Sequence, residues 1–167
     1  VGLKRIEILS TDSKYQNGVF STLIEESKSK DSHNCGVLIS TTDFDFNSFH
    51  SIDSKTIIQT YPFDEDQWFQ IELTKGMALI HAIRIKNNQL KAFKVLATDD
   101  KRKPLDSWIK LIEVKEKSAN LHKKLAIYNL DCPSPPVNVI RIIQISPSWD
   151  NNKRLVLYHF DIFGYYI

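Results

Sequence analysis

Hydrophobic residues alternate with polar ones along most of the chain after Asp31, and this period of two constrains the fold more than any other feature. The pattern is plain at Phe69, Ile71 and Leu73, and again from Val156 to Ile162. Such alternation buries one face of a β-strand and leaves the other in water. No helical segment separates these runs, so a parallel sheet, which needs crossover helices, is excluded. The sequence predicts about eight strands in an all-β antiparallel sandwich or barrel.

Two segments depart from simple alternation. The run Val139–Ile145 is apolar on both faces, which is typical of a central strand that is covered on both sides. Near the N-terminus, Val19/Phe20 and Leu23/Ile24 recur four residues apart and so share one face of a short helix, with Asn17 as a fair N-cap. We expect residues 1–34 to form an extension whose helix packs on the sandwich, and residues 35–167 to form the sandwich domain.

Charge and composition exclude several classes of protein. The 22 basic and 20 acidic residues give a net charge of +2, without the basic stripe that a nucleic-acid binder needs. No apolar run approaches the roughly 20 residues that span a bilayer. Cys35 and Cys132 are too few for a disulfide framework and lack metal-ligand spacing, which favours two idle thiols over one bridge. We therefore expect a soluble, cytoplasmic chain without a metal or cofactor, as part of a larger intracellular protein.

The sequence offers little support for catalysis. No HExxH or GxSxG motif is present, and the five glycines form no phosphate-binding loop. The five histidines show no ligand spacing, and the carboxylates of Asp64–Asp66 are most simply solvated loop charges. A hydrolase acting through Asp64, Glu65, Asp66 and a histidine is the weakest of the alternatives. We predict that the chain is not an enzyme, and we name no catalytic residue.

Aromatic residues in polar loops are more informative. Burying a phenylalanine contributes about 1.5–3 kcal/mol, so three of them in one polar loop need a reason. They are Phe44, Phe46 and Phe49. Either they plug the open end of the sandwich or they meet a ligand. Trp149, next to Asp150, Asn151 and Asn152, can likewise stack on a sugar or cap the core. Trp68 opens an alternating strand, and we expect it in the core.

Five segments in a fixed order carry a resemblance to a known family. They are Trp68–Leu73 (WFQIEL), Ile80–Ile85 (IHAIRI), Phe93–Thr98 (FKVLAT), Val139–Ile145 followed by Trp149, and Phe160–Gly164 (FDIFG). Together they resemble the discoidin domain, also called the coagulation-factor type C domain, of the galactose-binding-like sandwiches. The helical segment NGVFSTLIEES resembles the preface of intracellular members, which often follow a BTB–BACK adaptor region.

The resemblance implies an eight-stranded antiparallel jelly-roll sandwich that binds ligands at one end. The family's binding loops match Thr41–Phe49, Lys86–Asn88, Asp99–Pro104 and Trp149–Asn152. The ligand-binding residues implied by these loops and their aromatics are Phe44, Phe46, Phe49, Asn87, Asn88, Trp149, Asp150, Asn151 and Asn152. The family's calcium loop would fall at Asp53-Ser54 with Asp161 as partner acid, but the glycine of that loop is missing, which argues against calcium.

These observations favour a non-catalytic binding module that recognises a protein or a carbohydrate through loops at one end of the sandwich. BTB–BACK-type domains are expected neighbours in the full-length protein. The alternative is a structural scaffold domain whose loops are plugged and whose flat sheet face makes any contact with a partner.

Overall fold

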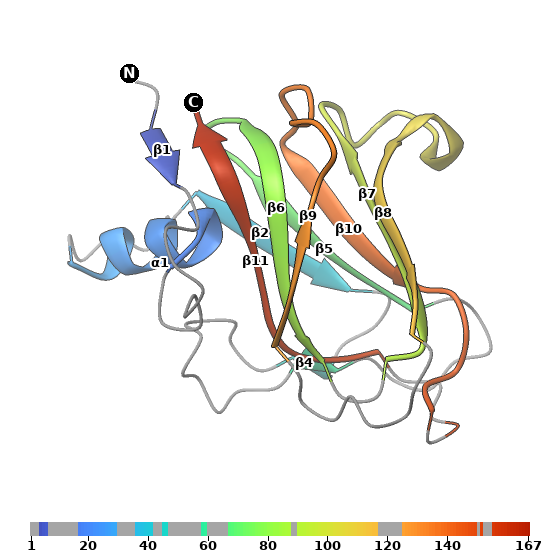
Figure 1. Ribbon diagram of the computed structural model, residues 1–167. Coiled ribbons are helices and arrows are strands. Elements are labelled where there is room, and N and C mark those ends of the chain that lie inside the picture. Colours follow the sequence, from blue (N-terminus) through green and yellow to red (C-terminus); the bar gives the residue numbers. More distant parts are fainter. Residues whose placement is uncertain are drawn as a thin grey trace.

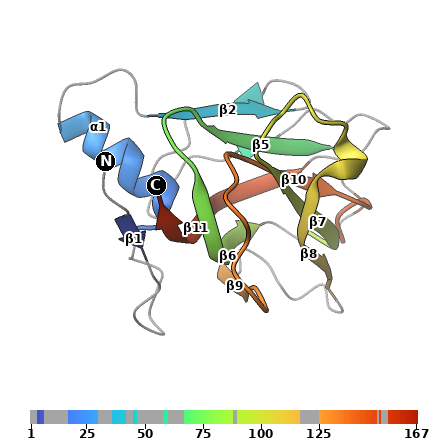
Figure 2. The same cartoon turned by 90° about the horizontal axis from the view of Figure 1, so that it is seen from above.

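The computed structural model describes residues 4–6, 17–29, 36–41, 45–46, 58–59, 67–87, 90–116, 125–149, 151 and 155–167. Two antiparallel sheets face each other across a hydrophobic core, and helix α1 (Val19–Ser29) lies at one side of the pair (Figures 1 and 2). Eight strands have five residues or more within this part of the chain. The predicted eight-stranded antiparallel sandwich is therefore confirmed.

One sheet has five strands in the order β2-β5-β10-β7-β8. Their bounds are Val37–Thr41 for β2, Trp68–Leu73 for β5, Val139–Gln144 for β10, Ala92–Thr98 for β7 and Ile109–Lys115 for β8. A short 3-10 helix, η2 (Leu105–Ser107), precedes β8. Strand β10 lies in the centre, as its apolar sequence predicts.

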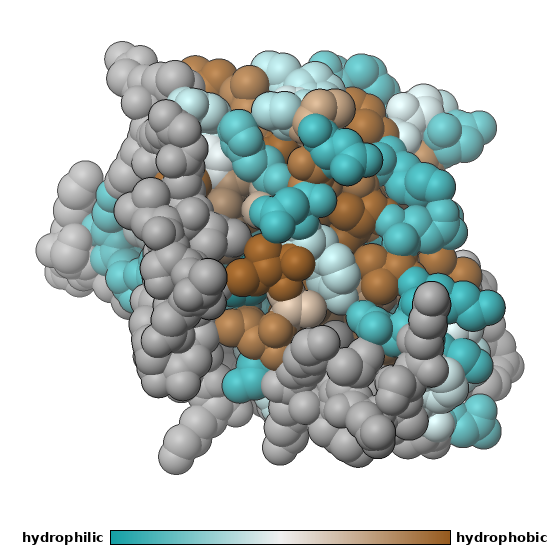
Figure 3. All heavy atoms as spheres, viewed as in Figure 1, coloured by the Kyte–Doolittle hydropathy of each residue, from teal (hydrophilic) through white to brown (hydrophobic). Residues whose placement is uncertain are grey.

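The second sheet has the order β3-β4-β11-β6-β9, and β1 pairs with the far end of β11. Their bounds are Asp45–Phe46 for β3, Ile58–Gln59 for β4, Val156–Tyr166 for β11, Ala78–Asn87 for β6, Leu125–Asn129 for β9 and Lys4–Ile6 for β1. Where it is coloured, the face of β6 and β9 mixes apolar and hydrophilic residues (Figure 3).

The inward-facing residues of both sheets form the main core. On β10 these are Ile140 and Ile142, and on β11 they are Phe160 and Ile162. Phe69 of β5 meets the Phe160 ring edge-on, with 6.3 Å between the ring centroids. The alternation in the sequence therefore reports which side chains point between the sheets.

A second, smaller cluster covers the outer face of β10. Val139 and Ile143 are buried there with Leu96 and Trp108. The guanidinium carbon of Arg141 lies 4.0 Å from the ring centroid of Trp68 and 4.9 Å from that of Trp108. Trp68 is thus half-buried on the outer face, so the expectation that it lies in the core holds for this smaller cluster and not for the main core. Phe69, Ile71 and Leu73 point inward, and the pleat turns Trp68 outward.

Helix α1 contacts β11 of one sheet and β2 of the other and so closes one side of the sandwich. Its Val19 and Phe20 are part of the main core, and the Phe20 ring stacks on Phe160 at 6.0 Å. The predicted helix is confirmed, and it packs on the sandwich. A domain boundary between residues 34 and 35 stays a prediction.

The cap of this helix comes from the other end of the chain. The carboxylate of Asp161 accepts hydrogen bonds from the backbone N–H groups of Gly18 (2.8 Å) and Phe20 (2.9 Å). The side-chain amide of Asn17 instead donates to Glu25, at 2.6 Å. Asn17 is therefore not the capping residue that its position in the sequence suggested.

Among the described residues, no helix is long and apolar enough to cross a bilayer.

Candidate functional site at one end of the sandwich

The candidate site lies at the end of the sandwich where β6 and β10 finish and β7 and β11 begin, at the bottom of Figure 1. We call this end the rim. Residue Gln144 at the end of β10 pairs with Phe93 near the start of β7. On the other sheet, Leu157 near the start of β11 pairs with Asn87 at the end of β6. Both sheets thus contribute to the rim.

Two predicted binding residues of the six-stranded sheet are brought to the rim by strand pairing. Phe46 of β3 pairs with Ile58 of β4, and β4 pairs with the start of β11. Asn87 lies next to the same part of β11. Their side chains are not described. Other predicted site residues lie outside the described residues, namely Phe44, Phe49, Asn88, Asp150 and Asn152, as do Asp53 and Asp64–Asp66.

The turn Asp99–Pro104 does not belong to the rim, so grouping it with the other three loops was wrong. It follows Thr98, which pairs with Val139 at the start of β10, so it lies at the opposite end. Its charges pair with one another: Lys103 Nζ lies 2.6 Å from Asp99, and Arg102 lies 3.0 Å from Asp100. Hydrogen bonds from Arg102 lower the pKa of Asp100 to about 2.

A tight turn presents Trp149 at the rim. The backbone N–H of Asn151 donates to the carbonyl of Ser148 at 2.8 Å, which places Trp149 in the second position of a β-turn. Asn151 has a φ of 61°, a left-handed conformation that asparagine tolerates better than most residues. The buried Ser148 hydroxyl accepts a hydrogen bond from Gln144 Nε2 at 3.2 Å, which anchors the turn to β10.

Trp149 is half-buried, between the two alternatives that the sequence left open. Lys91 Nζ lies 4.8 Å from its ring centroid, within the range of a cation–π interaction. The ammonium group therefore lies over one face of the indole. The indole Nε1 is buried and has no hydrogen-bond partner among the described residues.

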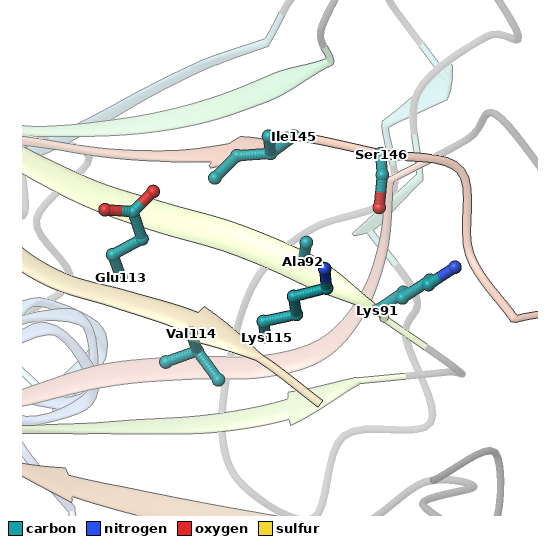
Figure 4. Close-up of a pocket in the computed structure, with 7 residues that line it drawn as sticks. All are labelled: Lys91, Ala92, Glu113, Val114, Lys115, Ile145 and Ser146. Carbon is teal, nitrogen blue, oxygen red and sulfur yellow. The ribbon is translucent and has the colours of Figure 1, made fainter. Parts of the chain in front are cut away.

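A pocket of about 270 Å³ lies beside this turn on the outer face of the five-stranded sheet (Figure 4). Ala92 of β7 lies in the middle of it, paired with Lys115 of β8 on one side. On the other side, the backbone N–H of Ile145 donates to the Ala92 carbonyl at 2.9 Å. A small side chain between two long ones leaves a hollow. The lining residues are Lys91, Ala92, Glu113, Val114, Lys115, Ile145 and Ser146.

The charges around this rim pocket are not balanced. Glu113 is paired with Lys110 at 2.6 Å, which lowers the pKa of its carboxyl. Within the described part of the chain, Lys91 and Lys115 make no ion pair. The sequence reasoning missed both lysines, because an isolated lysine at a strand end is indistinguishable from any other solvated charge. Only the pairing of β7 with β8 brings them to one pocket.

No group of three or more potential metal ligands occurs among the described residues. The implied calcium partner, Asp161, is fully buried, and its carboxylate accepts hydrogen bonds from three backbone N–H groups, of which the third is that of Ile162. Burial raises the pKa of its carboxyl. Asp161 therefore holds helix α1 in place and is wrongly assigned to a calcium loop.

The two described histidines are also structural in their surroundings. His159 is buried and accepts a hydrogen bond from Arg84 Nε at 3.1 Å. Burial and the nearby charges of Arg84 and Lys86 lower the pKa of His159 to about 3, so the ring is neutral at pH 7. His81 packs against Tyr165, with 5.3 Å between the ring centroids.

No protein-family model and no curated protein matches the chain. Solved structures do match it. CpGH89CBM32-5 from Clostridium perfringens, in complex with GalNAc-β-1,3-galactose, has a TM-score of 0.58 and 16% identity over 77% of this chain and 95% of its own. The family 32 CBM of C. perfringens NanJ, in complex with galactose, has a TM-score of 0.56 and 14% identity over 79% and 94%.

The fucolectin from striped bass (Morone saxatilis) serum has a TM-score of 0.58 and 9% identity, over 77% of this chain and 47% of its own. At such identities a structural match shows a shared fold. The chain therefore has the galactose-binding-like, discoidin-type β-sandwich fold of carbohydrate-binding modules and fucolectins.

Proposed function

We propose that this chain is a non-catalytic carbohydrate-binding module that binds its ligand at the rim. The observation that carries the proposal is the position of Trp149: a tight turn anchored to β10 holds a half-buried indole at the end of a sandwich. The fold is that of modules whose structures contain galactose or a galactose disaccharide.

Trp149 supplies the contact that a sugar requires most. The C–H face of a sugar ring is apolar, and a flat aromatic ring packs against it. The Lys91 ammonium group lies over the indole, so a sugar that packs against the ring lies beside this charge.

The remaining rim residues are proposed to bind the sugar's hydroxyl groups and edges. Asparagine carries both a donor and an acceptor, which matches the hydroxyl group of a sugar. Asn151 is exposed on the same turn as Trp149. We assign Phe44, Phe46, Phe49, Asn87, Asn88, Asp150 and Asn152 to the same binding surface, on the basis of their loops.

The wider context of the module is also a proposal. The resemblance of the helical segment NGVFSTLIEES to intracellular discoidin proteins supports a cytoplasmic protein in which BTB–BACK-type domains precede this one. A protein ligand at the rim is the second candidate, supported by that resemblance.

The test is binding to a glycan array followed by calorimetry with the glycans that bind. Trp149→Ala is expected to weaken binding at least about tenfold, whereas Trp149→Phe, which keeps a stacking surface, retains most of it. Leu105→Ala, at an exposed apolar residue of η2 at the opposite end, serves as the control.

Melting curves separate a binding defect from a folding defect. Trp149→Ala is expected to lower affinity with a change in Tm of only a few degrees, since the side chain is half-buried. Undiminished glycan binding by Trp149→Ala, or a wild-type domain that binds no glycan on the array, would contradict the proposal.

A further inference from the structure

We infer that the ligand of this module is an anionic glycan, whose negative group binds in the rim pocket between Lys91 and Lys115. The inference rests on the proposed function and goes beyond it, because a fold shared with galactose-binding modules says nothing about ligand charge. Three features of the pocket carry it: its position, its charges and its link to Trp149.

The position of the pocket makes it an extension of the proposed sugar site. Lys91 both lines the pocket and lies over the Trp149 ring. Ser146, three residues before Trp149, lines the same pocket. A sugar ring stacked on the indole therefore has a substituent within reach of the pocket, and a neighbouring sugar unit could occupy it.

The charges of the pocket favour a negatively charged substituent. Lys91 and Lys115 come from the paired ends of β7 and β8, where the Glu116 N–H donates to the Lys91 carbonyl at 2.7 Å. Neither ammonium group has a carboxylate partner in the described chain. The single acid of the lining, Glu113, is paired with Lys110 and lies at the end of the pocket away from Lys91 and Ser146 (Figure 4).

The lining also suits a sugar acid better than a small inorganic ion. Ala92 and Ile145 give the hollow an apolar wall, and Ile145 is 38% exposed. A hydrocarbon framework that carries a carboxylate or a sulfate matches apolar walls and two cations together. Two ammonium groups beside an apolar wall attract an anion more strongly than two in open water, because the local dielectric constant is lower.

Matched probes test the charge directly. Methyl galactoside, methyl galacturonide and methyl galactoside 6-sulfate share one ring and one anomeric substituent and differ at carbon 6. Calorimetry with the whole chain is expected to show at least about tenfold tighter binding of one or both anionic sugars than of the galactoside. Raising the salt concentration should remove most of this difference, because added ions screen exposed charges.

Lys115→Gln is the decisive variant, because Lys115 lines the pocket from β8, whereas Lys91 also lies over the Trp149 ring. It should remove most of the preference for the anionic sugar and leave galactoside binding unchanged. Lys101→Gln removes the same charge in the turn at the opposite end and should have no effect. The bare ions acetate and sulfate are included to show whether the sugar framework is needed.

The outcomes separate this inference from the proposed function. If the galactoside binds and neither anionic sugar binds more tightly, the anionic ligand is refuted and the sugar site stands. If Lys115→Gln and Lys101→Gln weaken anionic binding equally, the effect is one of net charge and the pocket assignment is refuted. If no sugar binds and array screening also fails, the proposed function fails first.

Discussion

Three backbone N–H groups converge on the carboxylate of Asp161, two of them from a segment more than 140 residues away. The first N–H groups of a helix have no partner within the helix, and a carboxylate is a strong acceptor for them. Asp161 thus links the end of the chain to the start of helix α1. A residue that the family resemblance implied as the partner acid of a calcium loop acts as a structural cap.

Replacing Asp161 with asparagine is expected to lower the free energy of unfolding by about 1–3 kcal/mol. The amide oxygen of the variant can still accept hydrogen bonds. Its NH₂ group, however, would face the Gly18 N–H, which in the native protein donates to the second carboxylate oxygen. Urea denaturation measures the loss. Glu113→Gln, at an exposed carboxylate, is the control and should change stability far less. A change below about 0.5 kcal/mol for Asp161→Asn would refute the capping role.

His159 gives the domain a defined pH dependence. Its pKa is lowered to about 3 in the folded state, whereas the unfolded chain takes up the proton near pH 6.5. Between these two values the unfolded state binds more protons, so stability falls as the pH falls from about 6.5 towards 3. At about pH 5 the loss from this residue should be about 2 kcal/mol.

The comparison that isolates this effect is His159→Gln, because glutamine can still accept the hydrogen bond from Arg84 and does not titrate. Chemical denaturation of both proteins at intervals from about pH 7 to pH 5 should show a flatter pH dependence for the variant. Parallel curves for the two proteins would show that His159 takes up its proton as readily in the folded state as in the unfolded state.

At the scale of elements, β6 pairs with one edge of β11, and several short elements cover successive parts of the other edge. Strand β4 pairs with Val156 and Leu157, and β1 pairs with Gly164–Tyr166. The N-terminus of α1 lies against the gap between them, where Gly18 approaches the Ile162 carbonyl so closely that a Cβ atom would overlap it. An uncovered strand edge invites pairing with other chains, and these elements leave little of it open.

Gly164 lies at a register shift between β11 and β6, with a φ of 149°. A Cβ atom there would overlap the carbonyl oxygen of Leu79, which belongs to the backbone and cannot move aside. We expect Gly164→Ala to lower the free energy of unfolding by more than about 3 kcal/mol.

Gly36 provides a matched control. Its φ of 77° also disfavours alanine, but the nearest atom to an added Cβ is in the flexible Lys75 side chain, at 3.3 Å. Gly36→Ala should therefore cost only about 1 kcal/mol. Equal losses for the two variants in thermal or urea unfolding would contradict the steric role of the Leu79 contact.

At the scale of the whole molecule, the sequence predicts the sandwich well because alternation is a local signal. The alternation within each strand predicts which face is buried, and the apolar run of β10 predicts that this strand is central. Trp68 shows the limit: the alternation places it on the face opposite Phe69, but it does not reveal that a second, smaller cluster lies on that face. Asn17 shows a second limit, because the residue that caps helix α1, Asp161, is distant in the sequence and close only in the fold.

The candidate site is less predictable for the same reason. The turn at Trp149 could be identified from its aromatic residue and polar neighbours, whereas Lys91 and Lys115 carry no signal until β7 and β8 pair. The turn Asp99–Pro104 has the composition of a binding loop, but it follows β7, which finishes at the end of the sandwich opposite the rim. Which loops share an end depends on strand direction, and composition does not report it.

The most direct test of sugar binding at the rim is an NMR titration of the amide-labelled domain with methyl galactoside and methyl galacturonide. The account predicts that the largest shift changes occur at the Trp149 indole and at the amides of Lys91, Ala92 and Ile145, with the turn Asp99–Pro104 unmoved. Shift changes centred on that turn or on the outer face around Arg141, or none with either sugar at millimolar concentration, would contradict it.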